Sequence, residues 1–327
     1  MSNPTADSAM VGTPADNAEE PTSPACVMSF NATDPSGAGG IAGDISTIAA
    51  MGAHPLPVVT AIVLRDTAEI FESSTIDADV IVEQARTILE DVTISAWKVG
   101  FLGSADGVAA AAEVLSDYTE VPLVAYLAPI TWLDEEEQQA YHEAWRELIL
   151  PAAEVLVGNQ QTLVDFLLPD WDNERPPSAR ELAVAAGEHG TRFVLVTGVQ
   201  LPGVKGAEGF VDNILASPQG AITGEKFERF ETAFIGAGDT LSAALAALMA
   251  SGEELHLAVG EALNFLDQSL DAGFRPGMGN VVPDRFFWAL PPPEGEEPGE
   301  DGEPPTDAEP APEAAQSAPA APSRRMH

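Results

Sequence analysis

The feature that most constrains the fold is a regular alternation of short apolar runs with segments of helical spacing. Apolar runs of strand length occupy residues 27–32, 57–64, 95–100, 121–126, 154–158 and 192–198. Helical spacing marks residues 40–51, 79–91, 105–117, 135–149 and 178–189. Apolar strands that alternate with helices are typical of a parallel sheet covered on both faces. We therefore predict an α/β fold with a mostly parallel central sheet.

The pattern changes toward the end of this alternation. Residues 209–217 and 221–230 have the character of shorter strands, which we expect to form an antiparallel edge. Two helices are predicted after them, at residues 238–251 and about 254–271. Ligands of such folds bind at the carboxyl ends of the strands, so the loops that follow the strands are the places to search.

The two ends of the chain have a different composition. Residues 1–24 are rich in Ser, Thr, Pro, Ala and Asp, and residues 291–327 form a Pro/Glu/Ala tract without an aromatic residue. Such segments bury too little apolar surface to offset their chain entropy, which predicts disorder. The predicted folded domain therefore spans residues 25–290.

Charge and cysteine content exclude several classes of function. The formal net charge is −38, and the chain has only three lysines, so neither nucleic acid nor an anionic membrane surface is an expected partner. One cysteine, Cys26, allows no internal disulfide. The sequence has no long apolar span and no signal-peptide pattern, so we expect a cytoplasmic location.

A glycine-rich loop, TDPSGAGGIAGDISTIAAMG, follows the first predicted strand at residues 33–52. Gly37, Gly39 and Gly40 allow the backbone to approach another group closely, and Asp44 lies in the first turns of the next helix. The loop is either part of a binding site or only a tight strand–helix connection with an aspartate favoured by the helix dipole.

A second glycine-rich turn, IGAGDTLSAALAALMASG, occupies residues 235–252. Backbone N–H groups of residues 236–239 at a helix start form a site for a phosphate or for charge that develops on one. Asp239 is then either an N-cap or a base that removes a proton from a hydroxyl group as that group attacks phosphorus.

These motifs, together with PLPVVTAIVLRDT and WKVGFLGS, resemble hydroxymethylpyrimidine and phosphomethylpyrimidine kinases of thiamine biosynthesis, over residues 26–290. That family belongs to the ribokinase-like superfamily. The resemblance implies a three-layer α/β sandwich, a homodimer, and the use of ATP and Mg²⁺. It further implies phosphorylation of 4-amino-5-hydroxymethyl-2-methylpyrimidine, followed by phosphorylation of its monophosphate.

The resemblance also assigns roles to residues. Asp239 takes the catalytic position, and Gly236, Ala237 and Gly238 match the anion hole. The expected substrate-binding residues are Asp44, Gly37, Gly39, Arg65 and Phe101. The expected nucleotide-binding residues are Asn159, Thr197 and Gly198.

The chain departs from the family pattern at several of these places. Asp239 stands where cysteine is usual, Arg65 where glutamine is usual and Phe101 where methionine is usual. Tyr126 and Thr162 replace two acidic residues that serve Mg²⁺, so the metal ligands are left unassigned.

Three functional hypotheses follow. The first is the pyrimidine kinase. The second is a related kinase with another alcohol substrate, such as pyridoxal, because Arg65 and Phe101 change the pocket. The third is a non-catalytic binding or regulatory protein on a kinase fold, because the acidic positions at Tyr126 and Thr162 are lost; the retained Asp239 argues against it.

Overall fold

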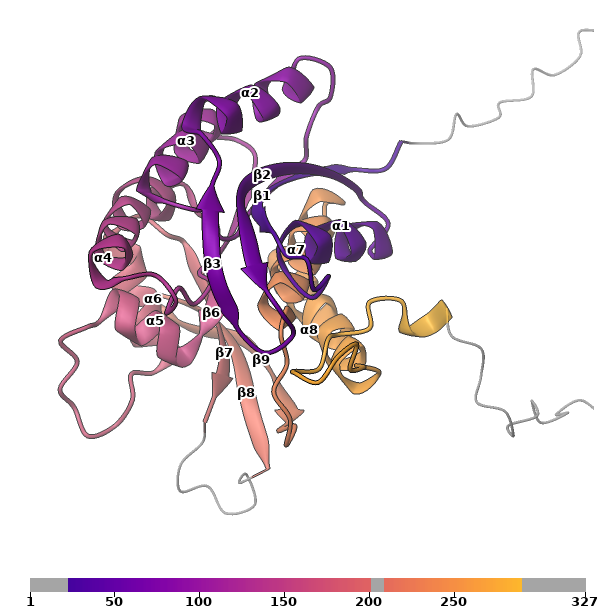
Figure 1. Ribbon diagram of the computed structural model, residues 1–327. Helices are drawn as coiled ribbons and strands as arrows, with labels where there is room; N and C mark the ends of the chain where they lie inside the picture. The colour runs from indigo at the N-terminus through magenta and orange to yellow at the C-terminus, as the bar shows by residue number, and fades with distance from the viewer. Residues whose placement is uncertain (1–22, 201–208, 290–327) are drawn as a thin grey trace, which may run out of the picture. The chain divides into compact units, whose positions relative to one another are not determined.

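The computed structural model describes residues 23–200 and 209–289 of the 327-residue chain (Figure 1). The predicted limits of the folded domain, 25–290, stay a prediction. The predicted disordered ends, 1–24 and 291–327, lie outside the described residues apart from residues 23 and 24.

One nine-stranded sheet organises the described part, in the order β3-β2-β1-β4-β5-β6-β7-β8-β9. Its strands are β1 (Cys26–Thr33), β2 (His54–Arg65), β3 (Ile70–Thr75), β4 (Ala96–Val99), β5 (Leu123–Tyr126), β6 (Val155–Asn159), β7 (Phe193–Val199), β8 (Phe210–Ser217) and β9 (Gly220–Glu228). Strands β2, β1, β4, β5, β6 and β7 run parallel. The flanking strands β3, β8 and β9 pair antiparallel, so the predicted antiparallel edge formed by β8 and β9 is confirmed.

Helices cover both faces of the sheet. They are α1 (Gly40–Ala50), α2 (Ala78–Leu89), α3 (Ala105–Ser116), α4 (Glu135–Ala144), α5 (Gln160–Leu167), α6 (Ala179–Glu188), α7 (Ala237–Ala250) and α8 (Leu255–Asp271). Figure 1 shows α1, α7 and α8 on one side of the sheet and α2 to α6 on the other. The predicted α/β sandwich of three layers is therefore confirmed.

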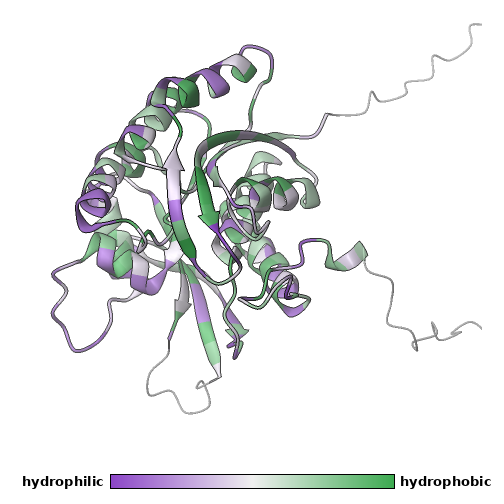
Figure 2. Cartoon of the chain, viewed as in Figure 1, coloured by the Kyte–Doolittle hydropathy of each residue, from purple (hydrophilic) through white to green (hydrophobic). Residues whose placement is uncertain are grey.

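Each face of the sheet has its own apolar core, because successive side chains of a strand point to opposite faces. Val27 and Ala96 pack with the α7 and α8 side, whereas Met28 and Trp97 pack with the α2 and α3 side. In Figure 2, β2 is largely hydrophobic along the strand, while α4 carries many hydrophilic residues. The buried strands thus hold their carboxyl ends in fixed positions.

Three local features differ from the expected pattern. Strand β3 was not predicted, because its sequence IFESST has no apolar run and it pairs only with β2 at the edge. Helix α5, of eight residues, was also not predicted. The predicted helix 135–149 is α-helical only to Ala144 and continues as a π-helical turn over Trp145–Ile149, just before Pro151.

Within the described ranges, no helix combines the length and apolar character needed to cross a membrane.

Candidate active site

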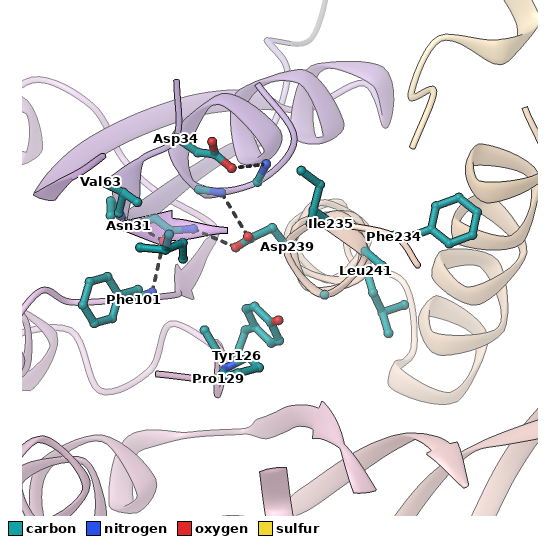
Figure 3. Close-up of a pocket in the computed structure, with 18 of the residues that line it drawn as sticks. Asn31, Asp34, Val63, Phe101, Tyr126, Pro129, Phe234, Ile235, Asp239 and Leu241 are labelled. Atoms are coloured by element: carbon teal, nitrogen blue, oxygen red, sulfur yellow. Dashed lines mark hydrogen bonds between the residues drawn. The ribbon is translucent and has the colours of Figure 1, made fainter. Parts of the chain in front are cut away.

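A pocket of about 420 Å³ opens at the carboxyl ends of the parallel strands. Its wall includes the last residues of β1, β2, β5, β6 and β7, and the turn that leads into α7 closes one side (Figure 3). The glycine-rich loop before α1 lies beside that turn. The topology therefore brings the two glycine-rich motifs of the sequence together.

Asp239 lies on the wall of this pocket, in the first turn of α7. Its Oδ1 accepts hydrogen bonds from Asn31 Nδ2 at 2.8 Å and Lys98 Nζ at 2.7 Å, and its Oδ2 accepts one from the Gly40 N–H at 2.9 Å. Figure 3 shows the contact between Asn31 and Asp239. The side chain is 15% exposed, so the carboxylate is held in one orientation and still reaches the pocket.

Lys98 lies between two carboxylates and has no exposed side-chain surface. Its Nζ is 2.7 Å from Asp239 Oδ1 and 2.8 Å from Asp44 Oδ1. Ser29 and Asn31 donate further hydrogen bonds to Asp44 at 2.5 Å and 2.9 Å. Paired and hydrogen-bonded in this way, the charges can remain buried.

The pKa values of this group follow from its geometry. Burial opposes ionisation of Asp239, but Lys98, the Gly40 N–H and Asn31 outweigh it, so the pKa of Asp239 is lowered. Burial raises the pKa of Asp44, helped by the nearby Asp239 and opposed by Lys98. Burial also works against the Lys98 ammonium, but the two carboxylates outweigh it and raise the pKa of Lys98. Asp239 is therefore ionised at neutral pH.

The turn before α7 needs glycine at two places. Gly236 has φ +82°, and a Cβ atom there would overlap the carbonyl oxygen of Ala38. A Cβ atom at Gly238 would overlap the ring of Tyr126. The first N–H groups of α7 have no acceptor within the helix, so they and the helix dipole make this end favourable for an anion.

Tyr126 forms the wall opposite Gly238, with Lys98 Nζ 5.7 Å from its ring centroid. Burial raises the pKa of Tyr126, and the charges of Asp239 and Asp44 raise it further. The phenol therefore stays neutral beside the start of α7 and adds no negative charge there.

One end of the pocket, near β2 and β3, is mainly apolar. Phe101 and Trp132 meet edge to face with ring centroids 5.3 Å apart, and Val63 lies on the same wall. Arg65 supplies a positive charge there, with NH1 3.5 Å from Asp34 Oδ2 and Nε donating to the Asp66 carbonyl at 3.0 Å. An aromatic ring fits such a surface, and Arg65 offers it only hydrogen-bond donors.

The other end of the pocket is formed by β6 and β7. Asn159 is the N-cap of α5: its Oδ1 accepts from the Thr162 N–H at 2.9 Å, and its Nδ2 donates to Thr162 Oγ1 at 2.8 Å. Thr197 lies on the neighbouring strand, with Oγ1 3.4 Å from the Gly158 carbonyl oxygen. Asp239 and the start of α7 border the same cavity.

The sequence placed most of its candidate residues at this pocket. Those that line it are Gly39, Arg65, Phe101, Asn159, Thr197, Gly236, Ala237, Gly238 and Asp239. Asp44, Gly37 and Gly198 do not line it. The N–H of Gly37 closes a turn to the Asp34 carbonyl at 3.1 Å, and that of Gly198 donates to Asn213 Oδ1 at 3.1 Å.

Asp44 differs most from its expected place. Its side chain is completely buried beneath the pocket, where Lys98, Ser29 and Asn31 surround it. A carboxylate enclosed by protein cannot touch a substrate in this conformation. Its observed contacts hold Lys98 in place.

Asn31 and Arg285 were not singled out from the sequence. Asn31 bridges Asp44 and Asp239 through Nδ2, while its Oδ1 accepts from the Phe101 N–H at 3.0 Å. A polar residue inside the apolar run VMSFNA was the available signal. Arg285, 5% exposed, contacts both glycine-rich loops from the C-terminal side of the domain, and no local pattern indicates that contact.

The site offers few ligands for a metal ion. In the portion of the chain that the structure describes, no three His, Cys, Asp or Glu side chains cluster in a way that could hold one. Tyr126 is neutral, Thr162 is bonded to Asn159, and Asp239 is already paired with Lys98. These residues do not fit a metal ion held by the protein itself.

Known proteins resemble this chain in sequence and in fold. The family model for phosphomethylpyrimidine kinase matches residues 34–284. A hydroxymethylpyrimidine/phosphomethylpyrimidine kinase of Streptomyces coelicolor is 27% identical over 272 residues, covering 83% of this chain and 97% of that protein. The enzyme of the same name from Escherichia coli is 30% identical over 250 residues, covering 74% and 90%.

Among solved structures, an ADP complex of Bacillus subtilis pyridoxal kinase matches the fold with a TM-score of 0.72. It is 22% identical and the match covers 82% of this chain and all of that one. This likeness is one of fold.

Proposed function

Because the chain belongs to the phosphomethylpyrimidine kinase family, we propose that it transfers the γ-phosphoryl group of ATP to 4-amino-5-hydroxymethyl-2-methylpyrimidine and then to the resulting monophosphate. The observation that carries this proposal is the place of Asp239. It lies at the start of α7, in a pocket with an aromatic end and an end formed by β6 and β7.

Asp239 is the proposed general base. Its lowered pKa keeps it ionised at neutral pH, so it can accept the proton of the attacking hydroxyl. A carboxylate of low pKa is a weak base, so the proton moves late, as the new O–P bond forms and the hydroxyl becomes acidic. This order suits the loose transition state of phosphoryl transfer, in which bond formation to the nucleophile is limited.

The anion hole is proposed to be the start of α7, with Gly236, Ala237 and Gly238. Arg65 is the only cation among the residues that line the pocket in the described part of the chain. Backbone N–H groups therefore have to supply most of the stabilisation of the transferring phosphoryl group. Their fixed orientation avoids reorganisation during the reaction.

Substrates would bind at the two ends of the pocket. We propose that the pyrimidine ring packs against Phe101 beside Arg65, and that ATP lies along Asn159 and Thr197. Asp44, Gly37 and Gly198 would act indirectly in this arrangement: Asp44 holds Lys98, and the two glycines shape the loops beside the pocket.

A pyridoxal kinase activity is the second candidate. Arg65 donates hydrogen bonds but cannot accept one, so it suits a ring that presents acceptor oxygens, as pyridoxal does. Solved pyridoxal kinases share the fold, which supports the candidate only at that level.

Mg²⁺ is proposed to enter with ATP. Mg²⁺ in kinase sites is bound largely by substrate phosphates and water. Since the described residues do not form a carboxylate site, no step of the proposed reaction depends on a metal ion held by the protein.

A homodimer and a cytoplasmic location complete the proposal. The β2–β3 edge leaves Ile62, Leu64 and Phe71 exposed, at 48%, 44% and 62%. Exposed apolar groups at a sheet edge favour pairing with another chain. The molar mass measured by light scattering after size-exclusion chromatography tests whether the protein is a dimer. The single cysteine suits a reducing compartment.

The experiment that tests the function is ADP release from Mg·ATP with the hydroxymethylpyrimidine, its monophosphate and pyridoxal in parallel. We expect both pyrimidines to have the higher kcat/KM, because specificity is set by differential transition-state binding. Turnover of pyridoxal alone would support the second candidate, a pyridoxal kinase that uses the same mechanism. A folded protein without any turnover would favour the non-catalytic hypothesis.

A further inference from the structure

Arg285 is a buried cation that the proposed chemistry does not use. It follows α8 in a segment without regular secondary structure, and only 5% of it is exposed. It does not line the pocket. Burying a guanidinium group is costly unless all its donors find partners, so its contacts indicate what it does.

The three nitrogens of Arg285 contact two segments that are far apart in the sequence. Nε donates to Thr240 Oγ1 at 3.0 Å, in the first turn of α7. NH1 donates to the Gly37 carbonyl at 3.4 Å, and NH2 donates to the Ala38 carbonyl. One side chain therefore joins the loop before α1 to the start of α7.

These contacts close a ring of interactions around Gly236. The Ala38 carbonyl, which Arg285 holds, packs directly against the Cα atom of Gly236. Thr240 Oγ1 accepts from Arg285 and donates to the Gly236 carbonyl at 2.8 Å. A shift of either glycine-rich loop would therefore break at least one bond of Arg285.

The same ring controls the orientation of Asp239. Gly40, whose N–H donates to Asp239 Oδ2, lies two residues after Ala38. A Cβ atom at Gly39 would come within 2.7 Å of Asp239 Oδ2, so this loop packs tightly against the carboxylate. Holding the loop fixes the donor that orients the base.

Arg285 also balances charge at the site. Asp34, Asp44 and Asp239 lie in or beneath it, and Arg65 and Lys98 neutralise only two of them. Arg285 interacts favourably with the charges of these three carboxylates and with that of its neighbour Asp284. It adds positive charge behind the start of α7, where phosphate groups are proposed to bind.

The backbone around Arg285 is anchored at the segment before the second glycine-rich turn and at α8. Val281 pairs with the strand-like segment before the turn, donating to the Ala233 carbonyl at 3.0 Å and accepting from the Ile235 N–H at 3.0 Å. The Asp284 N–H donates to the Ser269 carbonyl at 2.8 Å. The C-terminal segment therefore presents Arg285 from a fixed position.

We propose that Arg285 is a positioning residue for phosphoryl transfer, which holds the loop at Gly37–Gly40 and the start of α7 in register so that Asp239 and the anion hole face one phosphoryl group. This inference rests on the proposed function. It assigns a role in the reaction to a segment that supplies no other residue to the pocket.

The test compares Arg285→Met and Arg285→Lys with Arg275→Met. Arg275 lies in the same segment, is exposed, and contacts Thr232 and Gly279 instead of the glycine-rich loops. Thr240→Val serves if the Arg285 variants do not fold. It removes, at almost constant volume, both the acceptor of Arg285 Nε and the donor to the Gly236 carbonyl. The measurements are kcat, KM for the pyrimidine, affinities for AMP-PCP and AMP, and amide hydrogen exchange over residues 37–43 and 236–243.

We expect Arg285→Met to lower kcat by about tenfold or more while KM for the pyrimidine changes by less than about threefold. AMP-PCP should bind about tenfold more weakly and AMP as before, because only the former reaches the anion hole. Amides of both loops should exchange faster. Arg285→Lys should restore part of kcat, and Arg275→Met should leave all these values unchanged.

Three results would overturn the inference: unchanged kcat and exchange in folded Arg285→Met, an equal loss in Arg275→Met, or equal weakening of AMP and AMP-PCP. Failure of the proposed function is a separate result. It would be seen as a wild-type protein without turnover, and hydrogen exchange would still decide whether Arg285 holds the two loops.

Discussion

At the scale of single residues, the candidate site depends on charges that compensate one another away from water. Lys98 contacts Asp44 and Asp239, and Asn31 donates to both carboxylates. If one of these partners is removed, the charges of the others stay buried without compensation, and this lowers the stability of the fold. The network orients Asp239, and the loss of any one member is expected to destabilise the domain.

Replacing Lys98 tests this interpretation. Lys98→Met should lower the free energy of unfolding by about 3–5 kcal/mol at pH 8. Without the ammonium, the folded-state pKa of the buried carboxyls rises above the unfolded value. The folded state then binds protons more readily than the unfolded state, so the deficit should shrink as pH falls toward the unfolded pKa.

Urea unfolding at pH 5 and pH 8 measures the Lys98→Met effect. Lys226→Met on β9, an exposed lysine, is the control and should stay within about 0.5 kcal/mol of the wild type. A deficit that is the same at both pH values would contradict the account.

Residue types could be predicted from the sequence, but residue partnerships could not. A local pattern, a glycine-rich turn at a helix start, predicted a phosphate site and left Asp239 as either an N-cap or a base. The Asn31–Asp239 bond spans 208 positions, and the Arg285–Ala38 bond spans 247. No local spacing encodes such contacts. Asp44 was expected at the pocket because of the family resemblance, and it lies buried beneath the pocket.

At the scale of elements, the residue at the start of a helix can cap the helix, and it can also line the pocket. Asn159 caps α5 and also lines the pocket, whereas Asp134 caps α4 in a capping box and is absent from the pocket wall. This difference allows the effect of the cap on stability to be separated by experiment from the proposed role of Asn159 in nucleotide binding.

Asn159→Ala should lower the free energy of unfolding by about 1 kcal/mol, because it removes the cap, and should raise KM for ATP. Asn159→Asp should keep the stability, since aspartate also caps, yet raise KM for ATP by placing a charge near the phosphates. Asp134→Ala should cost a similar free energy without changing KM. Thermal unfolding and ATP titrations check this; an unchanged KM in Asn159→Asp would remove Asn159 from the proposed ATP site.

The same elements show where sequence patterns stop being informative. Strands such as β6 were predicted because a short continuous apolar run is typical of a strand that is buried on both faces. Strand β3 has mostly exposed side chains and therefore no apolar period of its own. It forms because it pairs with β2. Helix α5 has only eight residues, too few for a clear period.

At the scale of the whole molecule, the sheet determines where the pocket lies. Strands β1, β2 and β4 to β7 end at one edge, so the two ends of the pocket face each other across the start of α7. The segment after α8 then connects back to the loop before α1 through Arg285. Contacts between residues far apart in the sequence therefore join the described part of the chain at the edge of the sheet where the pocket opens.

The C-terminal tract should be dispensable for this domain. Deleting residues 292–327 is predicted to leave the melting temperature and kcat unchanged, because the tract contains no aromatic residue and few apolar residues that could pack. Differential scanning calorimetry and the ADP-release assay measure both. A large fall in melting temperature would show that the tract contributes to folding.

The most direct test of the central claim is ³¹P NMR of the products formed from ATP and the hydroxymethylpyrimidine, with wild-type protein and Asp239→Asn side by side. We predict a phosphate-ester signal, and then a diphosphate signal, that appear with ADP in the wild type and form about 10²-fold or more slowly in the variant. Equal product formation in Asp239→Asn, or ADP without a phosphorylated pyrimidine in the wild type, would contradict it.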